Sequence, residues 1–259
     1  MIPIRDENPT LRRAVTTLMV LGANVLVWVL VQGMGSEPAL VESICNLGLI
    51  PGEVLGQIPS GSSVRLGPEF VCAIDSSGSW WTAVSSMFMH GGWMHLIGNM
   101  WFLWIFGNNV EDVMGRFRFV LFYLLCGFAA GAAQMLSNPD SAIPMVGASG
   151  AIGGVMGAYA VLFPKVRVQT LLVLGFLVRM INVPAWGMLG YWFGLQVLMG
   201  LPRLGSEAGG VAFWAHVGGF LAGVVLVFVF RDPKLVAAHR AATRRALPRV
   251  GWPRSAAYR

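Results

Sequence analysis

Charged residues are scarce in this chain: Asp, Glu, Lys and Arg make up only 12% of its 259 residues, whereas 56% are hydrophobic. A soluble domain usually carries about 25% charged residues. Together with a mean hydropathy of +0.66, this deficit excludes an ordinary soluble domain and predicts an integral membrane protein. The 33 glycines suit that class, because small residues let helices pack closely in lipid.

The sequence also lacks the patterns of a metal site. Its three cysteines, Cys45, Cys72 and Cys126, have no zinc-type spacing, and no HExxH motif is present. We therefore expect no metal and no cofactor. Cys126 lies in an apolar run and is interpreted as a packing residue. Cys45 and Cys72 share one polar loop and could pair if that loop faces an oxidising compartment.

Neither a nucleic-acid site nor a cleavable leader is indicated. The net charge of +6 comes from basic residues gathered at the two tails, where membrane topology and lipid headgroups explain them. The N-terminus is polar through Arg13, and no small-residue cleavage site ends the first apolar run. We expect that run to remain as a membrane span, and we expect no nucleic-acid partner.

Six apolar stretches are candidates to cross a bilayer, which takes ~20 mostly apolar residues. Before the fifth lies Val168–Val178, which is apolar but short, and we interpret it as an interfacial or re-entrant piece. It leads to the true fifth span, which we expect to begin near Val183-Pro184-Ala185-Trp186. The sequence predicts an all-α bundle of six transmembrane helices over residues 14–230, between tails at 1–13 and 231–259. The predicted spans are Ala14–Met34, Met87–Val110, Phe119–Leu136, Ala142–Phe163, Met180–Leu201 and Val211–Phe230.

The distribution of basic residues predicts the orientation of these spans. Six spans place both tails on one side, and Lys and Arg concentrate in those tails and in the connections after the second and fourth spans. The other side holds only Arg65 and Arg203, with Arg179 unassigned. Basic residues favour the cytoplasm, so both tails are predicted to be cytoplasmic and the long connection Gly35–Ser86 extracytoplasmic. Two alternatives stay open for the basic C-terminal tail: a short helix on the lipid surface, or a disordered segment.

Three of the spans carry polar side chains that can act in catalysis. His95 and Asn99 lie in the second span, Ser149 in the fourth and His216 in the sixth. All three spans start on the outer side, so at 1.5 Å per residue these groups lie roughly 8–12 Å below the outer surface. Polar groups are costly inside a bilayer, and unrelated structural residues have no need to share one depth. The pattern predicts one shared site.

Structural explanations exist for each polar residue taken alone. The hydroxyl of a lone Ser in a helix commonly bonds its own backbone carbonyl, and His216, or His95 with Asn99, could join helices by hydrogen bonds. We expect His90 to fix the outer loop by a hydrogen bond and His239 to be solvated in the basic tail. Three acidic residues are interpreted as ordinary charges in connections: Glu111, Asp112 and Asp140.

Glycines flank both residues that would react. Close approach of the fourth and sixth spans would bring Ser149 within hydrogen-bond range of His216, ~2.6–3.2 Å. Ser149 also lies in the first turns of its helix, where free backbone N–H groups favour a developing oxyanion. His95 and Asn99 could add side-chain donors, and one such donor is worth ~3 kcal/mol in a transition state. The flanking glycines are Gly147, Gly150, Gly153, Gly154 and Gly157, with Gly219 and Gly223 in the sixth span.

The chain resembles the rhomboid intramembrane serine proteases of prokaryotes in four blocks of these residues, which occur in the same order and at the same spacing. The resemblance extends from Trp81 to Gly223. The blocks are His90-Gly-Gly-Trp-Met-His95-Leu-Ile-Gly-Asn99-Met, then Glu111 with Gly115 and Phe119, then Gly147-Ala-Ser149-Gly150, then Ala215-His216-Val-Gly-Gly219 with Gly223.

The resemblance implies a six-helix core and a Ser–His dyad, with Ser149 as nucleophile and His216 as general base. His95 and Asn99 would line the oxyanion hole together with the Ser149 amide. The implied substrates are single-span membrane proteins that reach the site laterally from the bilayer, past the region Trp186–Phe193, and are cut near the outer face. The implied location is a bacterial inner membrane.

Two positions depart from the family pattern. Thr82 follows Trp81 where many members have Arg, which bears on how the outer loop is anchored. Gly153 stands where some members carry an aromatic residue that stacks on the base, which bears on how His216 is oriented. Two alternatives to a protease are a relative that binds membrane helices without cutting them and a small transporter with a polar midplane site.

Overall fold

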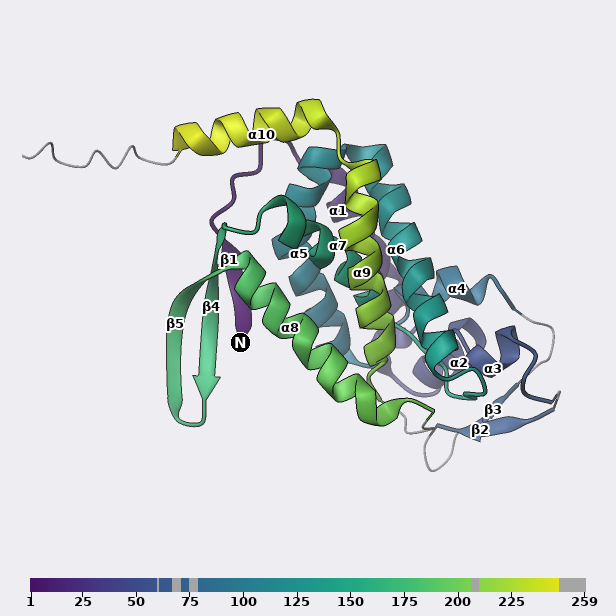
Figure 1. Ribbon diagram of the computed structural model, residues 1–259. Helices are drawn as coiled ribbons and strands as arrows, with labels where there is room; N and C mark the ends of the chain where they lie inside the picture. The colour runs from purple at the N-terminus through teal and green to yellow at the C-terminus, as the bar shows by residue number, and fades with distance from the viewer. Residues whose placement is uncertain (60, 67–70, 75–78, 206–209, 247–259) are drawn as a thin grey trace, which may run out of the picture.

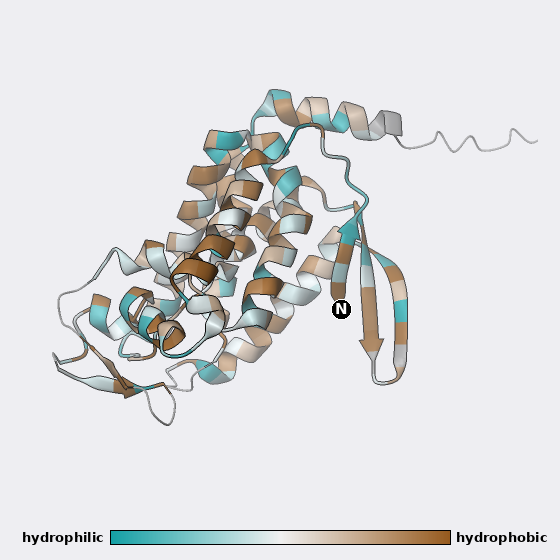
Figure 2. Ribbon diagram, turned by 180° about the vertical axis from the view of Figure 1, so that it is seen from behind, coloured by the Kyte–Doolittle hydropathy of each residue, from teal (hydrophilic) through white to brown (hydrophobic). Residues whose placement is uncertain are grey.

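The computed structural model describes residues 1–59, 61–66, 71–74, 79–205 and 210–246. Most of these residues are helical, and the longer helices pack into one bundle (Figure 1). Hydrophobic residues run along the bundle helices (Figure 2). Among the described residues, two helices, α6 and α9, are long and apolar enough to cross a membrane, and α1 and α7 are shorter apolar helices. The bundle helices are α1 (Val15–Leu30), α5 (Trp93–Met114), α6 (Arg116–Ser137), α7 (Ser149–Leu162), α8 (Ala185–Gly200) and α9 (Phe213–Phe230).

Two helices begin later than the hydropathy pattern predicts. α5 begins at Trp93 rather than Met87, and α7 at Ser149 rather than Ala142. α8 begins at Ala185, which confirms the expected start of the fifth span near Val183–Trp186. Glycine and proline set the observed starts: Gly92 precedes α5, Gly147 has φ +128° just before α7, and Pro184 is the residue before α8. Apolar composition alone does not separate an apolar loop from the helix that follows it.

The prediction of an all-α chain is wrong in part, because a small sheet lies beside the bundle. β4 (Arg167–Leu174) and β5 (Leu177–Pro184) form an antiparallel hairpin where we predicted an interfacial or re-entrant piece. β1 (Ile2–Asp6) pairs antiparallel with β4, giving the order β1-β4-β5. The segment is rich in β-branched residues and turns at Gly175, which has φ +59°. The hairpin lies beside α8 (Figure 1).

The connection between α1 and α5 is folded in its described part. It contains α2 (Ala39–Leu47), α3 (Pro51–Val54), β2 (Ser63–Arg65), β3 (Val71–Ala73) and α4 (Thr82–Ser85).

Two kinds of link hold this connection. A disulfide joins Cys45 to Cys72, so the pairing that the sequence left open is present. Leu49 and Met145 exchange two backbone hydrogen bonds of 2.9 and 2.8 Å. The second link fastens the connection to the segment that leads into α7.

Glycine-lined helices α7 and α9 cross at the centre of the bundle. A Cβ on Gly219 would overlap the backbone carbonyl of Gly150, and a Cβ on Gly223 would overlap that of Gly154. The two backbones therefore touch, which confirms the close approach predicted from the glycine spacing. Cys126 of α6 is buried against this crossing, as expected of a packing residue.

Glu111 and Asp112 are not the ordinary loop charges that we predicted. Both are buried at the end of α5, with exposed fractions of 3% and 4%. The Glu111 carboxylate accepts hydrogen bonds from the Thr16 and Thr17 amides, at 2.9 and 2.8 Å. Asp112 accepts from the amides of residues 11 and 12 and from the Arg12 side chain. The first N–H groups of a helix lack acceptors within that helix. The Glu111 carboxylate is the acceptor for the N–H groups of Thr16 and Thr17 in the first turn of α1.

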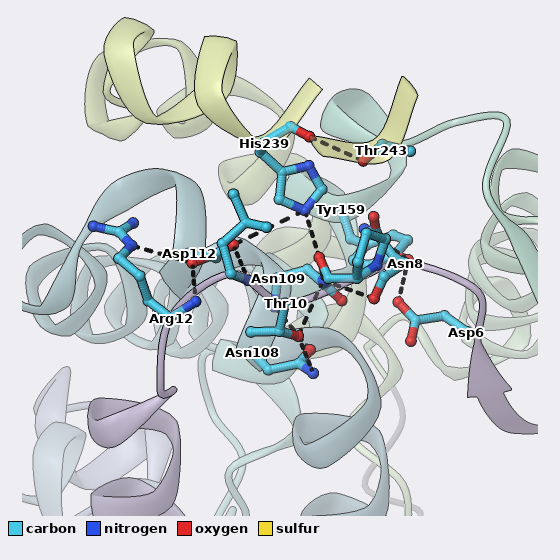
Figure 3. A network of polar contacts seen from close by, with 12 residues as sticks. Asp6, Asn8, Thr10, Arg12, Asn108, Asn109, Asp112, Tyr159, His239 and Thr243 are labelled. Carbon is cyan, nitrogen blue, oxygen red and sulfur yellow. Dashed lines mark hydrogen bonds and ion pairs between the residues drawn. The ribbon is translucent and has the colours of Figure 1, made fainter. Parts of the chain in front are cut away.

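The N-terminal segment passes between α5, α7 and the helix α10 (Pro233–Ala246), as Figure 3 shows. His239 of α10 is 2% exposed and donates from Nε2 to the Pro9 carbonyl at 2.9 Å. The expectation of a solvated His239 is therefore wrong, because the N-terminal segment lies against its ring. Burial raises the pKa of Asp6 to about 6, and the hydrogen bond from Tyr159 acts in the opposite direction.

The part of the basic tail that forms α10 is helical and lies across one end of the bundle (Figure 1). This outcome favours the helical alternative for residues 233–246. The remaining basic residues of the tail, Arg249, Arg254 and Arg259, lie outside the described residues.

Candidate active site

Ser149 and His216, predicted from two separate stretches of sequence, touch each other. Ser149 is the first residue of α7, and His216 lies in the first turn of α9. The Ser149 hydroxyl and the His216 Nε2 atom are 2.7 Å apart. The contact follows from the glycine crossing of the same two helices, because a short Ser side chain reaches a neighbouring helix only when the backbones are close.

A third residue, Gln196 of α8, completes the group and was missed in the sequence. Its Oε1 lies 2.8 Å from His216 Nδ1. An amide oxygen only accepts, so Nδ1 carries a proton and the Nε2 lone pair faces the Ser149 hydroxyl. The available signal was an uncharged polar side chain in an apolar helix. It was missed because the prediction relied on charged and nucleophilic residue types.

His95 and Asn99, one turn apart on α5, provide two unengaged donors. The Gly91 amide donates to His95 Nδ1 at 3.2 Å, so the proton of a neutral His95 ring lies on Nε2. A Cβ built on Gly147 would lie 2.7 Å from that Nε2 and 3.5 Å from the Ser149 hydroxyl, so His95 faces the serine side. The Asn99 amide nitrogen is buried and has no hydrogen-bond partner within the described residues.

His90 fixes the outer loop through its backbone. The Gln32 side chain accepts from the His90 amide and donates to the His90 carbonyl, both at 2.8 Å. The His90 ring packs edge-on against His95, with ring centroids 5.1 Å apart. Gln32 follows α1, so this pair of bonds ties the end of α1 to the start of α5.

Ser149, His216, His95 and Asn99 line a cavity of about 900 Å³. No acidic residue lines it within the part of the chain that the structure describes, and His95 is the other imidazole beside His216. α5, α7 and α9 all begin at this cavity, and the positive ends of helix dipoles favour negative charge. The described residues contain no cluster of three or more His, Cys, Asp or Glu that could hold a metal ion.

Comparison with known proteins decides the family. A family model described as the rhomboid domain matches residues 77–233, more than half of the chain. This chain belongs to the rhomboid family. Membership makes it an integral membrane protein, in agreement with its composition, and confirms the resemblance read from the four blocks.

Curated relatives of this rhomboid include plant, bacterial and yeast proteins. The chloroplastic Rhomboid-like protein 11 of Arabidopsis thaliana is 32% identical over 191 residues, covering 72% of this chain and 62% of the relative. The Rhomboid protease GluP of Bacillus subtilis is 32% identical over 146 residues, covering 51% of this chain and 28% of the relative. The matches thus span less than two thirds of either relative, and they do not separate a prokaryotic from an organellar type.

Proposed function

We propose that this rhomboid is a serine-type endopeptidase that cleaves the transmembrane segments of single-span membrane proteins near the outer face of the bilayer. The observation that supports this most strongly is the 2.7 Å contact between Ser149 and His216 at a cavity. The His216 ring has its Nε2 lone pair toward the hydroxyl, which is the state a general base needs.

The chemistry follows the acyl-transfer route of serine hydrolases. His216 Nε2 takes the Ser149 proton while the serine oxygen attacks the peptide carbonyl. His216 then gives that proton to the leaving amine, and the C–N bond breaks to leave an acyl-enzyme. Water, deprotonated by His216, attacks the ester and releases the carboxylate product and the free Ser149 hydroxyl.

The oxyanion of each tetrahedral intermediate would be held by three donors. These are the His95 Nε2–H, the Asn99 amide and the Ser149 backbone N–H. The unpaired, buried Asn99 nitrogen supports this role, because a buried donor without a partner is costly unless a ligand fills the gap.

Replacing Asn99 by Ala should therefore lower kcat by about 10²- to 10³-fold with little change in KM. The reason is that the donor acts on charge that develops only in the transition state. Cleavage kinetics in proteoliposomes would measure the effect. Asn108→Ala, on the same helix but bonded to Thr10, is the matched control. An Asn99→Ala enzyme with the kcat of the wild type contradicts the role.

The proposed topology has six spanning helices with both tails in the cytoplasm of a bacterium and the protein in its inner membrane. The Cys45–Cys72 disulfide supports the placement of the connection outside the cytoplasm, because disulfides persist in oxidising compartments. Substrates would reach the cavity laterally, past residues Trp186–Phe193 of α8.

An activity-based probe tests the proposal directly. A fluorophosphonate reacts only with an activated serine, so the purified enzyme in detergent should be labelled and Ser149→Ala should not. Cleavage of a single-span substrate should disappear in parallel. A protein that binds the substrate helix without labelling or cleavage would instead be a non-catalytic relative. Solute flux that persists in Ser149→Ala would indicate a transporter.

A further inference from the structure

We infer that Gln196, on the face of α8 that also carries Trp192, is a positioning residue for the proposed catalytic base His216. The inference rests on the proposed function, because it concerns how His216 serves Ser149. It starts from the second hydrogen bond of the His216 ring, 2.8 Å from Nδ1 to the Gln196 amide oxygen.

The first step concerns the tautomer. A neutral imidazole has one N–H and one lone pair, and an acceptor at Nδ1 places the lone pair on Nε2. Gln196 provides that acceptor from a buried position, with an exposed fraction of 9%. Without it, a ring protonated on Nε2 would face the Ser149 hydroxyl with a donor and could not take its proton.

The second step concerns the choice of an amide over a carboxylate. No acidic residue lines the cavity in the described part of the chain, so the ring is held by a neutral partner. An unpaired carboxylate would be expensive to bury in an apolar helix. Glutamine gives the same acceptor geometry at lower cost, but it contributes no full negative charge to stabilise the imidazolium.

The third step concerns the face of the ring. A Cβ on Gly153 would lie 3.1 Å from the His216 carbonyl and 3.8 Å from the Trp192 ring. Trp192 lies beside the His216 ring, with centroids 5.7 Å apart and planes at 36°. Trp192 also packs near Phe220 of α9. Trp192 and Gln196 are four residues apart, so both side chains come from one face of α8 and lie beside the imidazole ring.

Gln196→Met tests the acceptor, because methionine keeps the length and shape of glutamine but offers only a weak acceptor. We expect kcat to fall about 10- to 100-fold, the usual cost of losing a partner that orients a functional histidine, with KM unchanged. Fluorophosphonate labelling should slow by a similar factor, since the probe depends on serine activation and not on substrate docking. Leu198→Ala, exposed on the same helix, is the control and should behave as wild type.

Gln196→Glu tests positioning against simple packing. A carboxylate restores the acceptor and also attracts the protonated ring, so kcat should recover relative to Gln196→Met and the acid limb of the pH–rate profile should move to higher pH. A residue that merely joins helices would not move that limb.

The outcomes separate this inference from the proposed function. If Ser149→Ala is inactive while Gln196→Met keeps wild-type kcat and labelling, the positioning role is wrong and the protease assignment stands. A Gln196→Glu enzyme with the wild-type pH profile also overturns the positioning role. If Gln196→Met does not fold, the pH–rate profile of Gln196→Glu is the test of that role. Activity that survives Ser149→Ala overturns the proposed function itself.

Discussion

Ser149→Ala should abolish cleavage of a single-span substrate in proteoliposomes, with kcat falling by about 10⁶-fold, the scale seen when a serine hydrolase loses its nucleophile. The substitution removes one oxygen, and no other hydroxyl lies at hydrogen-bond distance from His216 Nε2 among the contacts of the described residues. His216→Ala should cost about as much, because His216 is the base that the described contacts place at hydrogen-bond distance from the Ser149 hydroxyl.

The two substitutions should not add. A Ser149→Ala/His216→Ala double variant is expected to match either single variant, because residues that act as a unit lose their effect together. Ser137→Ala is the matched control: its hydroxyl bonds the Gln134 carbonyl, away from the dyad, and cleavage should persist. Substantial cleavage by Ser149→Ala would mean that another group attacks the peptide bond.

Gly223→Ala should lower the free energy of unfolding strongly. The added methyl group would overlap the Gly154 carbonyl, so α7 and α9 must separate along their length. Forcing a group into a packed site costs up to about 3 kcal/mol and sometimes more. Separation would also pull Ser149 away from His216, so activity should fall with stability.

Thermal unfolding in detergent, followed by tryptophan fluorescence, would measure this loss. Gly22→Ala on α1 is the control, because a Cβ there meets nothing within 4 Å. In that helix the same change should be neutral or stabilising, by up to about 1 kcal/mol from helix propensity. Equal unfolding temperatures for the two variants would show that the glycine crossing is not tightly packed.

The parts of the site that the sequence predicted are those fixed by residue type and helix spacing. Ser149 and His216 were visible because each is a reactive side chain in an apolar run, and Gly219 and Gly223 because small residues recur every four positions. Gln196 was not visible, since a glutamine in an apolar helix has no distinctive chemistry until its partner is known. Its role depends on how α8 sits against α9, which is a tertiary property.

The parts of the fold that were mispredicted share a different cause. Residues 142–148 are apolar enough to read as membrane helix, and residues 168–178 as an interfacial or re-entrant piece. The first segment is a loop, and the second lies in the β4–β5 hairpin. Hydropathy reports the surroundings of a segment, not its backbone conformation. The buried carboxylates Glu111 and Asp112 were mistaken for surface charges because their partners, the amides of residues 11–17, lie about a hundred positions earlier in the chain.

The hydrogen bonds between Leu49 and Met145 tie the connection between α1 and α5 to the proposed active site. Met145 stands four residues before Ser149 and lines the same cavity, so a segment outside the bundle supports the cavity wall beside Ser149. A shortened variant in which a short linker replaces residues 35–86 would keep the six bundle helices and both Ser149 and His216, but it would lose α2, α3 and α4. It would also lose the scaffold that aims the serine, so the smallest working unit of this protein is larger than its helical core.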